Sequence, residues 1–254
     1  WTMSSYASEA ANFGMFIGSY EVMRKGALRI RKAALDLGVS RVVVGECGHA
    51  WRVAYSFWNT LSGIGGGASD EYALKLQKQL DSNYPQPQHI IEFTYDLIQK
   101  GILIFDKTKN DHRNVTFHDS CNVARGSNMG NIENGQFILP REVIKAACNH
   151  FADMPKATIK ASTFCCGGGG GLLPDDLIEL RIKGAMPRMQ ALKQSQENDG
   201  VNTLAAICAI CKSQFSKVLP NYDFDPYMIV SVHQLVSDAL VLSDKSQSKV
   251  VDSL

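Results

Sequence analysis

The sequence lacks several features that would assign it to a common class of protein. Lys plus Arg number 26 and Asp plus Glu number 25, so no excess of charge points to nucleic acid or to an anionic membrane. The longest apolar runs, such as residues 204–211, are far shorter than the roughly 20 residues that cross a bilayer. No secretory pattern follows Trp1. We therefore expect a cytoplasmic chain without a membrane span of its own, which would reach a membrane only through partner subunits.

The chain also lacks an obvious internal repeat and any need for disulfide staples. At 254 residues it is long enough to bury a hydrophobic core. Its seven cysteines are an odd number, and without a secretory pattern they fit a reducing compartment where thiols serve metals or catalysis. The cysteines are therefore the first place to look for function.

Five of these cysteines are arranged around one glycine-rich stretch. Cys165 and Cys166 are adjacent and open onto the five glycines of residues 167–171. Neighbouring Cα atoms are about 3.8 Å apart, whereas an ordinary disulfide needs roughly 4.4–6.8 Å, so this pair is not expected to be bonded to itself. One cysteine stands upstream at Cys121, and a Cys-x-x-Cys motif, Cys208 and Cys211, stands downstream. We interpret the five thiols as the ligands of one metal cluster.

Other interpretations of the same cysteines stay open on chemistry alone. Cys208 and Cys211 have a spacing that suits structural zinc, although zinc takes four ligands and here there are five thiols. An ordinary cubane cluster also needs only four thiolates. The same motif could be a thioredoxin-like redox pair, or the thiols could be scattered and buried. The glycines could place backbone N–H groups close to an anionic cluster, above all Gly167 and Gly168, or could form a flexible hinge.

The spacing of the five cysteines resembles a known module. Residues 122–164 separate the first cysteine from the pair, and residues 167–207 separate the pair from the last motif, which are intervals of 43 and 41 residues. This is similar to the CCG module of heterodisulfide reductase catalytic subunits, C-x(n)-C-C-G-x(n)-C-x-x-C with n in the thirties to forties. The resemblance implies a non-cubane [4Fe-4S] cluster that reacts with a sulfur–sulfur bond, held by Cys121, Cys165, Cys166, Cys208 and Cys211.

Within that family the chain looks most like DsrK-type (HmeD-like) subunits of DsrMKJOP complexes. The matching phrases are residues 45–52, residues 117–125 and residues 163–173. The resemblance implies dissimilatory sulfur metabolism, with electrons exchanged with a membrane cytochrome b-type subunit and quinone. It also implies a substrate carrying a disulfide or trisulfide on a DsrC-like protein. Further [4Fe-4S] clusters are expected in a part of the protein that is not present in this chain. Electron-relay subunits of glycolate or lactate oxidation, and a zinc-stabilised scaffold without catalysis, are the competing functions.

The first part of the chain carries a second set of candidate residues. Residues 21–37 predict a helix that stops at Gly38, and residues 41–45 predict a buried parallel strand. The strand ends in Gly-Glu-Cys-Gly-His, and α/β folds place chemistry at the carboxyl ends of strands. We therefore name Cys47 as an extra ligand or redox thiol, His49 as a proton donor and Arg52 as a residue that orients an acidic partner. Cys47 could instead be a packing thiol, and His49 a core histidine bonded to backbone.

The remaining pattern predicts alternating strands and helices. Helices are expected over residues 51–61, 89–100, 140–151, 174–192 and 228–242, and strands over residues 114–118, 156–163 and 201–207. Residues 63–67, 82–87 and 125–134 are expected to be loops, residues 244–254 a polar tail, and Cys148 a core thiol. Arg181, Lys183, Arg188 and Lys193 are expected to be surface cations.

These elements together predict an α/β fold of two related modules, with short parallel sheets flanked by helices and the cluster at the strand ends between them. The polar stretch 107–114 marks the expected boundary. We assign residues 1–107 to a first CCG-type module, which is degenerate because Val44 stands where the family has a cysteine, and which lacks its earlier portion. Residues 108–254 form the second, complete module.

Overall fold

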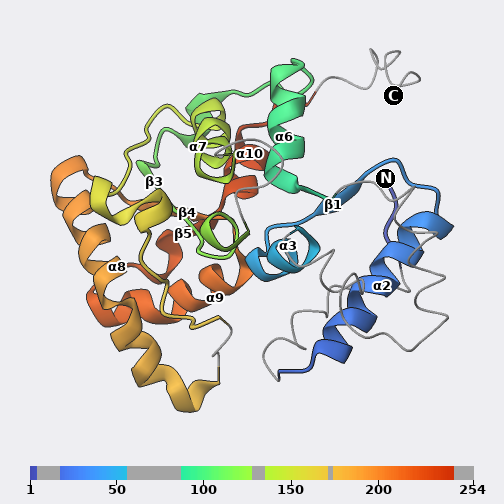
Figure 1. The fold of residues 1–254 in the computed structure, drawn as a ribbon. Coiled ribbons are helices and arrows are strands. Elements are labelled where there is room, and N and C mark those ends of the chain that lie inside the picture. Colours follow the sequence, from blue (N-terminus) through green and yellow to red (C-terminus); the bar gives the residue numbers. More distant parts are fainter. Residues whose placement is uncertain (5–17, 56–86, 128–134, 171–173, 243–254) are drawn as a thin grey trace.

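The computed structural model describes residues 1–4, 18–55, 87–127, 135–170 and 174–242, and the predicted α/β class is confirmed. The described residues contain a two-stranded sheet, β1-β2, and a three-stranded sheet in the order β3-β4-β5, and all pairs are parallel. Helices flank both sheets (Figure 1). No described helix is both long and apolar enough to cross a membrane.

The first sheet pairs two segments on either side of a helix. β1 (Val42–Val44) runs beside β2 (Pro87–His89), with Val42 opposite Pro87 and Val44 opposite His89. β1 was predicted to be buried, but Val43 is 40% exposed and its two neighbours are half-buried, because β1 is an edge strand of a two-stranded sheet. The predicted loop over residues 82–87 is also wrong at its end, since Pro87 begins β2.

Helix ends around this sheet follow local capping chemistry. The three helices are α2 (Tyr20–Asp36), α3 (Gly48–Tyr55) and α6 (Ile90–Gln99). The Ser19 side chain accepts from the Val22 N–H at the start of α2, and Gly38 follows with φ +61°, a conformation that favours glycine. At α6, His89 and Glu92 form a reciprocal capping box. The predictions of α2 and α6 are confirmed, whereas α3 begins three residues earlier than expected.

The second sheet contains three strands that come from distant parts of the sequence. β3 (Val115–His118) pairs with the central strand β4 (Thr203–Ala206), which pairs with β5 (Ile229–Ser231). Every residue of β3 and β4 is buried, as expected for strands covered on both faces. The covering helices are α7 (Gly135–Ala147), α8 (Ile178–Asp199), α9 (Ala209–Val218) and α10 (Val232–Ala239).

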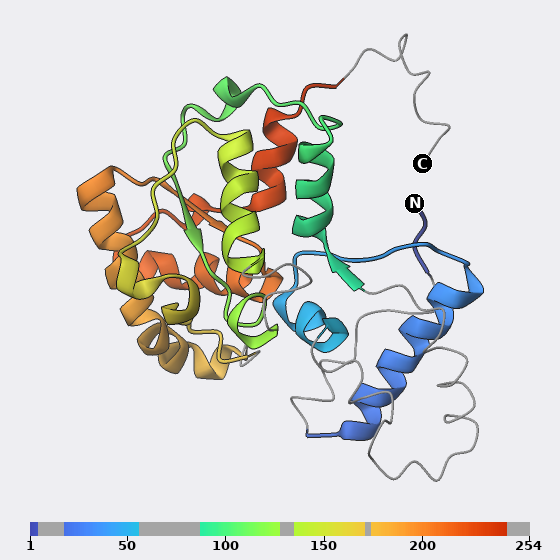
Figure 2. The same ribbon diagram turned by 45° about the horizontal axis from the view of Figure 1, so that its top comes forward.

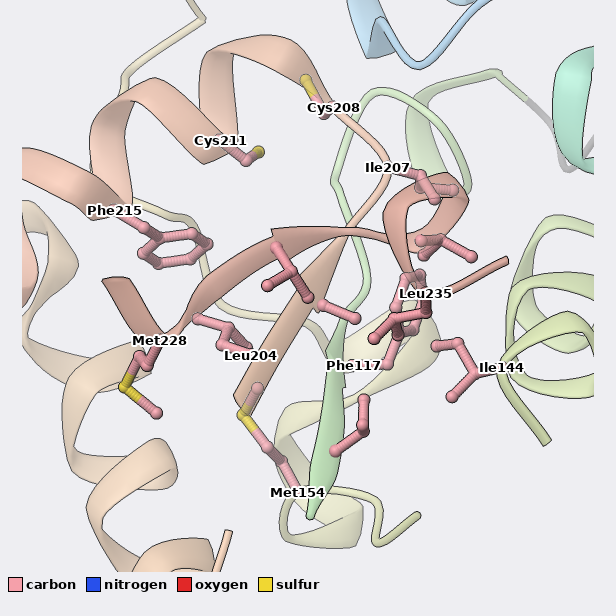
Figure 3. Close-up of a cluster of buried hydrophobic side chains, with 14 of the residues drawn as sticks. Phe117, Ile144, Met154, Leu204, Ile207, Cys208, Cys211, Phe215, Met228 and Leu235 are labelled. Atoms are coloured by element: carbon pink, nitrogen blue, oxygen red, sulfur yellow. The ribbon is translucent and has the colours of Figure 1, made fainter. Parts of the chain in front are cut away.

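The hydrophobic core lies on both faces of the three-stranded sheet. Figure 3 shows Ile144 of α7 and Leu235 of α10 on one side, and Phe215 of α9 on the other. The helices α6, α7 and α10 lie side by side in both ribbon views (Figures 1 and 2). Trp51 and Ile91, which precede residue 107, belong to the same buried cluster. The first part of the chain therefore packs directly against the second.

One predicted element in the second part is wrong, and two predicted helices have other bounds than expected. Residues 156–163 were predicted to be a strand but form two 3-10 helices, Lys156–Thr158 and Lys160–Ser162, and the Lys160 N–H donates to the Asp119 carboxylate where a strand would bond to a neighbouring strand. The closing helix was predicted to begin at residue 228, but its β-branched start pairs with β4 as β5, and only α10 is helical. The stretch 174–192 begins as a 3-10 turn over Asp175–Leu177 and continues to residue 199.

The start of α7 shows how burial overrides a local signal. Pro140 was predicted to lie in the first turn, but the helix begins at Gly135 and Pro140 lies inside it. A proline inside a helix costs about 3 kcal/mol. Burying Phe137 and Leu139, which are 6% and 4% exposed, contributes about 1.5–3 kcal/mol each and offsets that cost. Cys148 is buried just after this helix, which confirms its prediction as a core thiol.

Other predictions lie partly or wholly outside the described residues. They are the end of the helix over residues 51–61, the loop over residues 63–67, most of the loop over residues 125–134 and the polar tail. The 3-10 helix Lys107–Asn110 stands at the predicted module boundary, and one sheet precedes it while the other follows it.

Candidate metal centre

The carboxyl ends of β3 and β4 place cysteines at the same edge of the sheet. β3 ends at His118 and is followed at once by Asp119, Ser120 and Cys121. β4 ends at Ala206, Cys208 precedes α9 as its N-cap residue, and Cys211 lies in the first turn of that helix. Figure 3 shows both of these cysteines beside the sheet. Because the strands are parallel, both cysteine-bearing loops leave the sheet on one side.

The vicinal pair joins the two loops into one group, which we call the cysteine cluster: Cys121, Cys165, Cys166, Cys208 and Cys211. Cys165 hydrogen-bonds to Cys121 and to Cys166. Cys166 hydrogen-bonds to Cys211, which in turn hydrogen-bonds to Cys208. The five thiols thus form an unbroken series of contacts, and none of them is in a disulfide. The structure therefore brings together all five cysteines that the sequence singled out.

The electrostatics of the cysteine cluster show that its thiols cannot all ionise by themselves. Hydrogen bonds from Cys121 and Cys166 lower the pKa of Cys165, and the N–H of Gly167, 3.3 Å from its Sγ, lowers it further. The neighbouring Cys165 in turn raises the pKa of Cys121 and raises that of Cys166 to about 12. Several thiolates this close repel one another, so full ionisation requires a cation between them. A metal centre supplies such a cation.

Gly167 is fixed in place by its close approach to α8. Its φ is +88°, and a Cβ atom there would lie 2.3 Å from the carbonyl oxygen of Arg181 and 2.9 Å from the Cβ of Ala185. No side chain fits this space. Gly168 donates its N–H to Cys166, and a Cβ on it would lie 3.3 Å from the Cys166 Sγ. These two glycines are therefore packed residues that aim N–H groups at sulfur, rather than a hinge.

Arg188 places a buried positive charge beside the cysteine cluster. It was predicted to be a surface cation, as was Arg181, but they are 1% and 2% exposed because both lie on the face of α8 that covers the sheet. The guanidinium of Arg188 donates to neutral groups, among them the Met154 Sδ at 2.7 Å and the Thr163 Oγ1 at 2.9 Å. Within the described part of the chain it forms no ion pair with a carboxylate. A buried cation needs counter-charges, and those that act on Arg188 are the Asp119 carboxylate, which is already paired with Arg141, and the cysteines of the cluster.

Asp119 locks the loop before the vicinal pair onto the loop that carries Cys121. Its carboxylate accepts two hydrogen bonds of 2.7 Å from Arg141 and one of 2.8 Å from the Lys160 N–H. Its carbonyl oxygen accepts from the Thr163 hydroxyl at 2.8 Å. Asp119 and Arg141 are almost fully buried. This network explains why residues 160–163 approach Cys121 without forming a strand.

The turn after β1 covers the cysteine cluster from the first part of the chain. The Gly48 N–H lies 3.4 Å from the Cys208 Sγ, and a Cβ on Gly48 would lie 3.1 Å from both Asn122 and Ser120. His49 is 2% exposed and hydrogen-bonds to Cys208, whose pKa is lowered well below its usual range first by Cys211 and also by His49. This turn therefore completes the surroundings of the thiols.

The predicted catalytic residues are placed on that turn and on α3. The Asn122 side chain bonds the Nε2 of His49 at 3.0 Å and accepts from the Arg52 Nη1 at 3.0 Å. His49 therefore bonds to a side chain, which differs from the alternative of a core histidine that bonds only to backbone. Cys47 is half-buried at the start of α3, next to Gly48. The roles of Cys47, His49 and Arg52 stay predictions.

Two residues beside the site were missed by sequence reasoning. Glu46 is a hub whose carboxylate accepts from Lys212, from the Ser231 hydroxyl at 2.6 Å and from the His233 N–H at 3.0 Å. Burial alone raises its pKa, but these hydrogen bonds lower it to about 2. His118, at the end of β3, has a ring nitrogen in one group with the sulfur atoms of Cys166 and Cys211. The only available signal was that each is a polar residue at the end of a strand.

The residues present fit an iron–sulfur cluster. Thiolates are soft ligands that favour iron–sulfur clusters, zinc and copper(I), and five of them exceed the four that zinc takes. Backbone N–H groups and a buried arginine beside them suit an anionic centre. The ligand atoms of His118, Cys166 and Cys211 lie within 4.8 Å of one another, so the sulfur atoms of these two cysteines are close enough to share one centre.

Comparisons with known proteins agree with this chemistry. The chain is 39% identical, over 95% of its length, to an Hdr-like menaquinol oxidoreductase iron-sulfur subunit 2 of Archaeoglobus fulgidus, and 38% identical over 95% of its length to such an iron-sulfur subunit of Archaeoglobus profundus. It spans 44% of the length of each. An EtfAB:quinone oxidoreductase of Syntrophomonas wolfei is 36% identical over 93 residues, 37% of the chain and 11% of that protein. No family model matches the chain. These relatives support the Hdr-like resemblance and do not single out DsrK-type subunits.

Proposed function

We propose, from this similarity to Hdr-like iron–sulfur subunits, that the chain is the cluster-binding part of an oxidoreductase subunit that exchanges electrons with a sulfur–sulfur bond. The proposed cofactor is a non-cubane [4Fe-4S] cluster. Its proposed ligands are the five members of the cysteine cluster, with Gly167 and Gly168 lining it.

The observation that carries this proposal is the continuous contact of all five thiols. A zinc site or an ordinary cubane would leave one thiol over. The fifth thiol lies in the same series of hydrogen bonds as the other four, which favours a centre that uses all of them. The buried charge of Arg188, which forms no direct ion pair with a carboxylate among the described residues, further favours an anionic centre.

The bound cluster would supply one-electron redox chemistry and iron sites for the sulfur fragment. Reduction of a disulfide takes two electrons and two protons, breaks the sulfur–sulfur bond and yields two thiols. The chain's own part is to hold the cluster, to orient the substrate and to deliver protons. We assign proton delivery to His49, redox or ligand chemistry to Cys47, and orientation of an acidic group on the partner to Arg52.

The partners follow from the same resemblance. The names of both archaeal relatives include menaquinol, so we propose that electrons pass between this centre and membrane quinone through a cytochrome b-type subunit of a DsrMKJOP-like complex. The proposed substrate is a DsrC-like protein with a disulfide or trisulfide, as for DsrK-type subunits in sulfur metabolism. The chain would be cytoplasmic and peripheral to the inner membrane, with further [4Fe-4S] clusters in a part of the protein outside this chain. Residues 1–107 and 108–254 would be two related modules.

A second candidate function is electron relay without sulfur chemistry, of the kind found in glycolate or lactate oxidation. The partial match to an EtfAB:quinone oxidoreductase favours it. The two functions differ in one reaction: chemically reduced protein would release thiols from an added disulfide or trisulfide substrate only under the first. Titration of the thiols formed in a single turnover separates them.

The cluster itself is tested by metal analysis of the full-length subunit purified without oxygen. The wild type is expected to be brown and to contain iron and acid-labile sulfide. Cys165→Ala is expected to lose the iron, since Cys165 contacts two other members of the cysteine cluster. Cys148→Ala is the control, because Cys148 is a buried thiol outside the cysteine cluster, and it is expected to keep the iron. A colourless wild type with zinc, or unchanged iron in Cys165→Ala, would contradict the proposal.

A further inference from the structure

His118 lies beside the cysteine cluster in a fixed orientation. It is the last residue of β3, it is 1% exposed, and it stands opposite Ala206 of β4. Its ring packs edge-on against Phe215 of α9, with centroids 4.9 Å apart and planes at 89°. Successive strand residues point to opposite faces, and the guanidinium of Arg141 lies over the ring of the preceding Phe117 on the other face. His118 therefore faces α9 and its cysteine.

Both ring nitrogens of His118 are buried and have no hydrogen-bond partner among the described residues. Such groups are rare, because a buried polar atom without a partner is unfavourable, and each one calls for an explanation. One ring nitrogen of His118 and the sulfur atoms of Cys166 and Cys211 are all within 4.8 Å of one another. The missing partner would therefore belong to whatever the thiols hold.

The chemistry of the site decides which role the ring takes. In every protonation state at ordinary pH an imidazole ring carries at least one N–H, so His118 can donate a hydrogen bond. A neutral imidazole carries one N–H that donates and one nitrogen that accepts. The five thiols already exceed the number of ligands in ordinary clusters, so a sixth ligand is not needed. A donated N–H suits sulfur that carries negative charge.

We infer that His118 donates a ring N–H to a sulfur atom of the proposed cluster beside Cys166 and Cys211, and thereby raises the reduction potential of that cluster. This inference rests on the proposed function, because it requires an iron–sulfur centre among the thiols. The reduced centre carries one more negative charge than the oxidised one, so a hydrogen bond to its sulfur stabilises the reduced form more. His118 would be a positioning and tuning residue, and the five cysteines would remain the ligands.

Two substitutions separate the hydrogen bond from packing. His118→Phe keeps an aromatic ring against Phe215 but removes both nitrogens, whereas His118→Gln keeps an N–H donor. His150→Gln is the control, because His150 is exposed. The readouts are iron content and the reduction potential, from a titration followed by electron paramagnetic resonance of the anaerobically purified full-length subunit. His118→Phe is expected to shift the potential to a lower value at unchanged iron content, His118→Gln to restore part of that shift, and His150→Gln to match the wild type.

A measurement on the wild type keeps the test decisive if a variant fails to fold. With ¹⁵N-labelled histidine, a weak nitrogen coupling to the reduced cluster that persists in His49→Gln, which removes the other histidine beside the thiols, supports a hydrogen bond from His118. A strong coupling from an iron–nitrogen bond overturns the inference, and so does the absence of any coupling or an unchanged potential in an iron-loaded His118→Phe. A wild type without iron would instead refute the proposed function, so the two failures are distinguishable.

Discussion

The substitution Gly167→Ala tests whether the glycine-rich stretch is shaped around the cysteine cluster. The added Cβ would lie 2.3 Å from the Arg181 carbonyl oxygen and 2.9 Å from the Ala185 Cβ. The first is a backbone atom of α8, and the second is bonded directly to its backbone. These atoms cannot move without shifting the helix. Gly170→Ala is the matched control, because Gly170 also has a positive φ of +74° but nothing lies within 4 Å of its added Cβ.

The expected magnitudes follow from two separable effects. A left-handed backbone conformation costs an alanine roughly 1–2 kcal/mol, so this strain lowers the free energy of unfolding of both variants by that amount. Overpacking typically lowers the free energy of unfolding by a further amount of about 1–3 kcal/mol, and this applies only to Gly167→Ala. Gly167→Ala should therefore be less stable than Gly170→Ala by about 1–3 kcal/mol, which corresponds to a further decrease in melting temperature of about 2–12 °C for a chain of this size.

The assay is thermal unfolding together with iron content, on full-length protein handled without oxygen. Gly167→Ala should also retain less iron, because its N–H donates to Cys165 from a position that the added Cβ displaces. Gly170→Ala should retain the wild-type iron content. Equal melting temperatures and equal iron in the two variants would refute the argument that contact with α8 shapes this turn.

Two further predictions concern buried charges. Hydrogen bonds to Glu46 outweigh its burial and lower its pKa to about 2. This shift should contribute up to about 3 kcal/mol to the free energy of unfolding. The contribution is fully present above about pH 4.5 and is lost as the pH falls toward 2. Glu46→Gln should flatten this acid dependence in unfolding experiments between pH 5 and pH 2, and an unchanged dependence would exclude Glu46 as its source. Arg188→Met should lower iron retention, since the buried cation is removed from beside the thiols, whereas Lys183→Met on the exposed face of the same helix should not. Equal iron loss in both variants would contradict a role for the charge of Arg188.

The fold class and the main strands could be predicted because their signals are local. The β-branched run at residues 42–44 and the apolar strand at residues 203–206 have few alternatives, and helix caps such as Ser19 are visible in the sequence. Residues 156–163 alternate as a strand does, but a strand needs a neighbour, and here the Lys160 N–H and the Thr163 hydroxyl donate to Asp119 instead. That choice depends on contacts between residues 41 and 44 positions apart, which a local pattern does not contain.

The cysteine cluster could be predicted because its residue types have few structural uses at that spacing. All five thiols are brought together. The residues around them were harder to predict, because a polar residue on a helix is usually exposed. Arg181 and Arg188 were therefore predicted to be exposed. They are buried in the structure, because they lie on the face of α8 that packs against the vicinal pair and the sheet. The importance of His118 and Glu46 could not be predicted, because it depends on contacts with residues of other strands and helices.

The most direct test of the central claim is anomalous diffraction at the iron edge from crystals of the full-length subunit grown without oxygen. The account predicts one compact group of four irons among the sulfur atoms of Cys121, Cys165, Cys166, Cys208 and Cys211, with all five within bonding distance of iron. A single zinc ion bound by four of these thiols, or no metal among them, would contradict it.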